Sequence, residues 1–111
     1  MIFFKSTVSP DSDKKIIFEA IENDSIYATC TLILDGSKAE IVSLTCDESK
    51  PYICEGIIKS AFNYACIKNC YMGYINIKKE ISPLCAKAFH EENGIYFNDI
   101  PTILQGNCCQ K

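Results

Sequence analysis

Arginine and tryptophan are absent from this sequence of 111 residues, and histidine occurs once, as His90. All eleven basic residues are lysines spread along the chain, and the formal net charge is −3. Nucleic-acid binding needs a concentrated basic face, and arginine makes the commonest base contacts. The sequence therefore predicts no nucleic-acid partner.

Long apolar runs are also absent. A membrane-spanning helix needs about twenty consecutive apolar residues, and no stretch of this chain approaches that length. Residues 1–4 are too few for the apolar part of a signal peptide, because polar residues follow at once. We therefore expect no membrane association and a cytoplasmic location. The exclusive use of lysine and the frequent isoleucine are typical of an AT-rich genome, which favours a bacterial source.

Cysteine is frequent, but its pattern is not that of a zinc site or a disulfide framework. No Cys-x-x-Cys pair occurs, and one histidine cannot complete the usual ligand sets of structural zinc. Most cysteines lie in apolar segments, where a free thiol packs as a small hydrophobic group, so we expect reduced thiols and no metal. A thiol or metal role stays open for two pairs: Cys66 and Cys70, which are four residues apart, and the adjacent Cys108 and Cys109. The eight cysteines are Cys30, Cys46, Cys54, Cys66, Cys70, Cys85, Cys108 and Cys109.

Composition and length bound the architecture. Hydrophobic residues make up 48% of the chain and charged residues 23%, which is typical of a globular protein and not of a disordered one. A chain of this length has room for one hydrophobic core. We predict a single domain over residues 1–111.

Strand patterns dominate the first half. Runs rich in β-branched and aromatic residues predict strands at residues 1–4, 15–21, 26–34 and 38–46. Turn residues at 6–15 predict a polar loop, and Asp35-Gly36 predicts a hairpin turn. Two or three antiparallel strands are therefore expected first.

Two helices are predicted in the second half. Pro51 stands at a first-turn position, and apolar residues recur at helical spacing to about residue 66 or 68. The apolar run at 71–77 predicts an interior strand, so strand, helix and strand favour a right-handed parallel crossover. Ser82 as N-cap, Pro83 at the first helical position and Asn93-Gly94 as the stop predict a second helix. Residues 95–97 and 101–104 are predicted as short strands.

Three segments in this order resemble the acetyl-CoA-dependent N-acetyltransferases of the GNAT superfamily. Residues 38–48 resemble the family's central strand and its exit. Residues 52–65 are similar to its Tyr-Arg-Gly-x-Gly-Ile-Gly loop and helix, and residues 82–95 to its late Ala-x-x-Leu-Tyr-Glu-Lys-Leu-Gly-Phe segment. The resemblance implies an α/β (α+β) fold class, with a mixed, mostly antiparallel twisted sheet and two main helices. The family's N-terminal helices are not expected, because residues 6–15 are too short and polar.

The resemblance also implies a cofactor, acetyl-CoA. In the family, the pyrophosphate lies on the N-terminus of the helix after the central strand, where unpaired amides and the helix dipole favour negative charge. The backbone groups of Leu44 and Cys46 match those that bind the pantetheine arm. The positions that match the phosphate loop are Cys54, Glu55, Gly56, Ile57 and Ile58.

This loop departs from the family pattern. Gly56 is kept, but two glycines are replaced, by Cys54 and Ile58, and the arginine is replaced by Ile53. Glycines let backbone amides approach phosphates closely, so the branched side chain of Ile58 is expected to crowd the cleft.

Two residues are implied as catalytic. His90 stands where the family often has a tyrosine that protonates the departing thiolate, and an imidazole can donate a proton near neutral pH. Glu40 matches the acidic residue that acts as general base through water in some members. For both residues the alternative is an ordinary solvent-exposed side chain.

Three functional hypotheses follow. The first is acyl transfer from acetyl-CoA to a small-molecule or peptide amine, with backbone amides of the central strand polarising the carbonyl. The second is a non-catalytic interaction module or homodimer whose cofactor cleft is filled by Ile53 and Ile58. The third is a thiol- or metal-responsive protein built on the cysteines.

Overall fold

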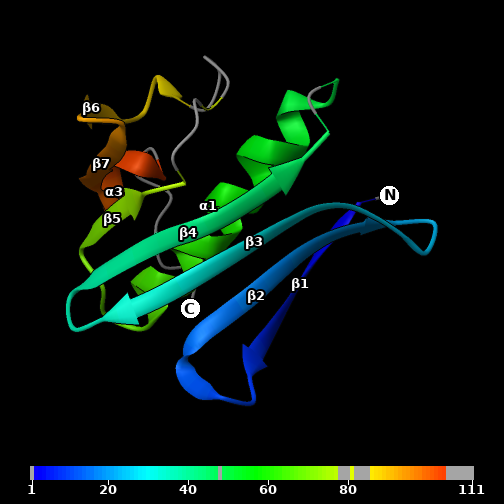
Figure 1. Ribbon diagram of the computed structural model, residues 1–111, viewed down its shortest axis with the longest axis horizontal. Coiled ribbons are helices and arrows are strands. Elements are labelled where there is room, and N and C mark those ends of the chain that lie inside the picture. Colours follow the sequence, from blue (N-terminus) through cyan, green and yellow to red (C-terminus); the bar gives the residue numbers. More distant parts are fainter. Residues whose placement is uncertain (1, 48, 78–80, 82–85, 105–111) are drawn as a thin grey trace.

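The computed structural model describes residues 2–47, 49–77, 81 and 86–104. The elements are β1 (Phe3–Ser9), β2 (Ser12–Glu22), β3 (Ser25–Asp35), β4 (Lys38–Cys46), α1 (Pro51–Ile67), β5 (Met72–Ile75), β6 (His90–Glu92), β7 (Ile95–Asp99) and α3 (Ile100–Ile103). The seven strands form one sheet in the order β1-β2-β3-β4-β5-β7-β6, with α1 behind its centre (Figure 1). All neighbouring pairs are antiparallel except β4 and β5. The predicted mixed, mostly antiparallel sheet with two helices is confirmed.

Two-residue turns connect the first four strands. Asn23 and Asp24, between β2 and β3, both have positive φ, 52° and 65°. A type I′ hairpin turn requires this combination, which Asn and Asp tolerate. Gly36 supplies the positive φ of 62° at the turn between β3 and β4, where Asp35-Gly36 predicted a hairpin.

The N-terminal segment differs from the prediction. Residues 6–15 form no loop, because β1 continues to Ser9 and β2 begins at Ser12. Only Pro10 and Asp11 make the turn, and the Asp11 amide donates to Ser9 Oγ at 3.2 Å. The polar residues that suggested a loop lie in the exposed end of a hairpin, where strands tolerate them. Among residues 2–47 no helix occurs.

Helix α1 packs against β2, β3 and β4 and forms the core with them. It begins at Pro51 as predicted and ends at Ile67, and Asn69 follows with a φ of 71°. It has 17 residues, and in the described part of the chain no helix is both long and apolar enough to cross a membrane. Its buried residues recur at the predicted helical spacing: Ile53, Cys54, Ile57, Ile58, Ala61, Phe62 and Ala65.

The second predicted helix is wrong over most of its described part. Ser82 and Pro83 lie outside the described residues; Ala86 is helical, residues 87–89 form a turn and bend, and β6 follows. Asn93 and Gly94, with φ of 55° and 83°, form the turn between β6 and β7. Asn-Gly is the preferred pair of a type I′ hairpin as well as a helix stop, and here it closes a hairpin.

The strand predicted at residues 101–104 is also wrong, whereas β7 contains the strand predicted at 95–97. Residues 100–103 form α3, with Pro101 in its first turn and Asp99 as N-cap. The Thr102 amide donates to Asp99 Oδ2 at 2.9 Å, and hydrogen bonds from the Thr102 side chain and from this amide lower the pKa of Asp99. Asp99 followed by Pro101 is a helix-start signal, but the apolar residues after Pro101 favoured a strand in the prediction.

Gly73 lets β5 lie close beneath α1 and α3. A Cβ atom built on Gly73 would lie 2.7 Å from Phe62 Cε1 and 2.9 Å from Ile103 Cδ1. Phe62 and Ile103 are 0% and 1% exposed, so neither side chain has solvent into which it can move. The close approach therefore depends on the missing side chain.

We expect Gly73→Ala to lower the free energy of unfolding by about 2 kcal/mol, because overpacking a closed core costs about 1–3 kcal/mol. Strand propensity alone would favour alanine, so the sign of the change is informative. Urea unfolding followed by circular dichroism measures it. Phe62→Leu removes the ring edge and should reduce the cost of Gly73→Ala. An equal cost in both backgrounds would contradict the close approach.

Candidate active site

The two parallel strands at the centre of the sheet pair over only four residues. The register of β4 and β5 runs from Lys38↔Met72 to Ile41↔Ile75. The Asn76 amide then donates to the Ile41 carbonyl oxygen at 2.9 Å. Beyond this point β4 continues, and among the described residues it pairs with β3 alone. The β5 side of residues 42–46 thus has no strand partner in the part of the chain that is described.

A β-bulge in β4 coincides with the end of this ladder. Val42 has no partner on β3, because Ile41 and Ser43 pair with consecutive residues there. Val42 and Ser43 are both exposed, and the inward positions shift from Ile41 to Leu44 and half-buried Cys46. Bulges bend a strand and turn its side chains in new directions. The strand therefore changes course where it loses β5.

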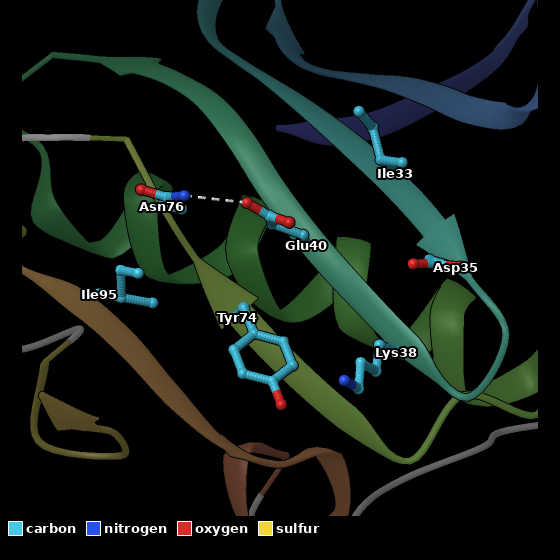
Figure 2. Close-up of a pocket in the computed structure, with 7 residues that line it drawn as sticks. All are labelled: Ile33, Asp35, Lys38, Glu40, Tyr74, Asn76 and Ile95. Atoms are coloured by element: carbon cyan, nitrogen blue, oxygen red, sulfur yellow. Dashed lines mark hydrogen bonds between the residues drawn. The ribbon is translucent and has the colours of Figure 1, made fainter. Parts of the chain in front are cut away.

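A pocket of about 400 Å³ opens beside the end of the ladder, on the face of the sheet away from α1 (Figure 2). It combines two carboxylates and one ammonium group with an amide, a phenol and two aliphatic side chains. Its volume lies within the range of small-molecule sites. It is lined by Ile33, Asp35, Lys38, Glu40, Tyr74, Asn76 and Ile95.

Glu40 is held in this pocket by Asn76. Asn76 Nδ2 donates to Glu40 Oε2 at 3.1 Å, and Figure 2 shows the two side chains pointing toward one another. The backbone of Asn76 is fixed at the same time by its hydrogen bond to Ile41. The end of the ladder therefore positions the carboxylate that the sequence implied as a general base.

His90 is not brought to this pocket. Glu40 pairs with Tyr74, Tyr74 with Phe97, and Phe97 with His90, in one row across β4, β5, β7 and β6. At about 4.8 Å between strands, the Cα atoms of Glu40 and His90 lie about 14 Å apart. The exposed His90 ring packs on Phe97, with centroids 5.6 Å apart. His90 lies on an edge strand, not on the predicted helix.

The N-terminus of α1 follows the free end of β4. Ser49 donates its hydroxyl and amide to Asp47 Oδ1 at 2.6 and 2.9 Å, which lowers the pKa of Asp47. Lys50 is the N-cap, its side chain makes no capping hydrogen bond, and the first turn holds no acidic residue. Lys50 Nζ lies 4.2 Å from the centroid of the Tyr27 ring. This helix end carries the Lys50 ammonium beside the Asp47 carboxylate. The amides of Lys50 and Ile53 already donate to the carbonyl oxygens of Asp47 and Lys50, both at 3.0 Å, and Pro51 has no amide hydrogen.

The residues that match the phosphate loop lie within α1. Counted from Pro51, residues 54–58 are the fourth to eighth helical positions, where amides bond to carbonyl groups four residues earlier. Cys54, Ile57 and Ile58 are buried in the core, and Glu55 forms an ion pair with Lys59 at 3.7 Å. The branched side chain of Ile58 thus packs against the sheet.

Gly56 has a packing partner. A Cβ atom on Gly56 would lie 2.6 Å from Cζ of Phe4, a β1 residue. Glycine is unfavourable within a helix, so its presence in α1 is explained by the aromatic ring that occupies the space of a side chain.

The cysteines differ among themselves. Cys30, Cys46, Cys54 and Cys70 form no disulfide, whereas Cys66 is disulfide-bonded, so the expectation of reduced thiols is wrong for Cys66. Pairing depends on which residues meet in the fold, and sequence spacing does not reveal that. Burial, with a smaller contribution from Cys46, raises the pKa of Cys30 to about 12, so this thiol stays protonated at neutral pH. Among the described residues, no three potential ligands are grouped to hold a metal ion. Outside the described residues lie Cys85, Cys108 and Cys109.

No protein-family model and no curated protein sequence matches the chain. Solved structures do match. The ribosomal-protein-S18-alanine N-acetyltransferase of Escherichia coli superposes with a TM-score of 0.71 at 10% identity, over 90% of this chain and 94% of that chain. An acetyltransferase of the GNAT family from Staphylococcus aureus Mu50 gives 0.58 at 17% identity, over 78% and 68%.

The chain has the GNAT fold. A further structure with this likeness is the PaiA N-acetyltransferase of Thermoplasma acidophilum in complex with coenzyme A, with a TM-score of 0.60 at 12% identity, over 76% of this chain and 58% of that chain. At these identities the GNAT likeness establishes the architecture, and the chemistry has to be argued from the residues of the site.

Six of the seven pocket residues of this GNAT-fold chain were missed by sequence reasoning, which found only Glu40. Tyr74 and Asn76 lie in the run at 71–77, which was predicted only as an interior strand. Asn76 interrupts that apolar run at the carboxyl end of a parallel strand, where ligands commonly bind in α/β sheets. That polar interruption was the available signal. Tyr74 needed the register with Glu40, which no local pattern contains.

We predict that the effect of Gly56→Ala depends on Phe4. With Phe4→Ala in place, Gly56→Ala should raise the free energy of unfolding by about 1 kcal/mol, the difference in helix propensity. With Phe4 present, the gain should be smaller or reversed, because the ring has to move. Urea unfolding of the four proteins in this double-mutant cycle measures the coupling. Equal effects in both backgrounds would show that the ring does not restrict Gly56.

Proposed function

We propose that the chain is an N-acyltransferase that transfers the acetyl group of acetyl-CoA, or a related acyl group, to the amine of a small molecule or peptide. One observation carries the proposal. The parallel ladder ends beside a pocket in which Asn76 holds the Glu40 carboxylate. An amine bound to Glu40 would lie two residues before the part of β4, residues 42–46, that has no described partner on the β5 side.

The residues around the end of β4 suit a CoA-type cofactor. The backbone of Leu44 and Cys46 is the part of β4 suited to the pantetheine arm, because it lies beyond the β5 ladder. We assign the phosphate contacts to the start of α1, where the Lys50 side chain makes no capping hydrogen bond, and not to residues 54–58, whose amides lie within the helix. The Lys50 ammonium adds positive charge there. Bound acetyl-CoA would supply the thioester whose acyl group is transferred.

Glu40 acts on the acceptor in this proposal. Amines are mostly protonated at neutral pH, and only the neutral amine is a nucleophile. Glu40 would accept the proton directly or through a water molecule, while Asn76 keeps the carboxylate directed into the pocket. Tyr74 and Ile95 form the wall toward β7 (Figure 2). His90 has no part in this proposal, because Tyr74 and Phe97 separate it from Glu40.

Calorimetric titration with acetyl-CoA tests cofactor binding. We expect a dissociation constant in the micromolar range, and Lys50→Ala should weaken binding about three- to ten-fold through the loss of one positive charge near the phosphates. Lys59→Ala, a variant on the third turn of the same helix, is the matched control. Absence of heat at millimolar acetyl-CoA would remove the transferase proposal and favour a non-catalytic interaction module.

Glu40→Gln tests the chemistry. We expect kcat/KM for acetyl transfer to an acceptor amine to fall about 100-fold or more, because a positioned general base contributes at least that factor. Acetyl-CoA affinity should stay unchanged. Glu19→Gln is the control, since Glu19 is a β2 carboxylate opposite Lys5 and outside the pocket. Unchanged kcat/KM in Glu40→Gln would rule out Glu40 as the base.

A further inference from the structure

The two edges of the sheet differ in how they are protected. β6 forms one edge with only three residues, and two of them are Glu91 and Glu92. β1 forms the other edge with seven residues, of which Lys5 alone is charged. Short edge strands and charged residues prevent sheet edges from pairing with other chains. β1 is longer than β6 and has a single charge, so it is less protected. Figure 1 shows β1 as the outermost strand at its end of the sheet.

The side of β1 that faces α1 is apolar and only partly covered, although the Phe4 ring lies against Gly56 of α1. Phe4, Ser6 and Val8 pair with buried residues of β2, yet Phe4 and Val8 are 38% and 47% exposed. A groove of about 230 Å³ runs between this side of β1 and α1, where Ile67 is also exposed. The inner face of the sheet therefore continues past the edge of the helix that covers it.

We propose that β1 is a homodimer interface, in which it pairs antiparallel with β1 of a second copy across a two-fold axis at Ser6. The two seven-stranded sheets then become one continuous sheet. Edge amide and carbonyl groups of β1 bond to the partner strand, and both copies of α1 lie on the same face. The exposed apolar side chains of the two strands come together beside the groove.

The position of Lys5 and the register of the apolar residues in β1 favour pairing with a second copy about an axis at Ser6. Ser6 is the middle residue of Phe3–Ser9, so an axis there overlaps the whole strand. Phe4 then faces Val8 of the second copy, an aromatic and β-branched pair of the kind that stabilises sheets. Lys5 faces the uncharged Thr7. An axis one residue earlier would place Lys5 opposite Lys5, which like-charge repulsion disfavours.

The interface is small, since it consists of one strand and the groove beside it. Interfaces of this size are typical of weak or transient association, so we expect a dissociation constant in the micromolar range. The pocket around Glu40 stays open in both copies, because β2 and β3 separate β1 from β4.

Opposite charges at position 7 test the register. Thr7 is exposed, so both variants should fold, which thermal unfolding checks. We expect Thr7→Glu to lower the dimer dissociation constant about five-fold and Thr7→Lys to raise it about five-fold, because each dimer contains two contacts between position 7 and Lys5. Repulsion between two chains of net charge −3 predicts the opposite order. Sedimentation velocity without reductant measures the constants, and non-reducing gel electrophoresis of the same samples checks that no intermolecular disulfide has formed.

Thr45→Glu and Thr45→Lys are the matched controls, since Thr45 is an exposed strand residue of β4, away from β1. They should change the dissociation constant less than about two-fold. A wild-type protein that sediments as a monomer up to about 500 µM would overturn the proposal. Thr7 variants that follow the order set by net charge would overturn the pairing at Ser6.

Discussion

The interface that α1 forms with β2, β3 and β4 is the constraint on which the other elements depend. α1 buries seven residues in the core that it forms with these strands and α3, and because the connections at its two ends are short, β4 and β5 lie side by side and parallel. Gly73 completes this arrangement, because its missing side chain is where Phe62 and Ile103 lie. The depth of β5 beneath the helix, and with it the position of Tyr74 and Asn76, follows from the packing of the core.

The position of the candidate site is determined first by the backbone of β4 and β5. The bulge at Val42 and the hydrogen bond from Asn76 to Ile41 occur at the same level of the sheet, and there the parallel ladder ends. Glu40 precedes that point by one residue, so the amide that closes the ladder also places an amide side chain beside the carboxylate. This coupling explains how the chain places a carboxylate in a pocket near the stretch of β4 that has no described partner on its β5 side.

Sequence patterns correctly predicted the elements in which apolar residues recur at regular spacing. They failed at residue pairs that are compatible with two different structures. The periodicity after Pro51 and the long strands ending at Asp35 and Cys46 gave correct helix and hairpin predictions. The pairs Pro10-Asp11 and Asn93-Gly94 mark turns, but whether they close a hairpin or end a helix depends on strands elsewhere in the chain. The misplacement of His90 followed from the second of these errors, whereas Glu40 was found because its strand was.

The turn at Pro10-Asp11 also determines what the edge strand can bury. Because only two residues join β1 and β2, no segment lies between them that could cover the α1-facing side of β1. α1 already packs against β2, β3 and β4, so it cannot move over β1 without losing these contacts. The Phe4 ring already lies against Gly56 of α1. The parts of Phe4 and Val8 that stay exposed among the described residues can be covered by a second strand with the same alternation of apolar and small polar residues.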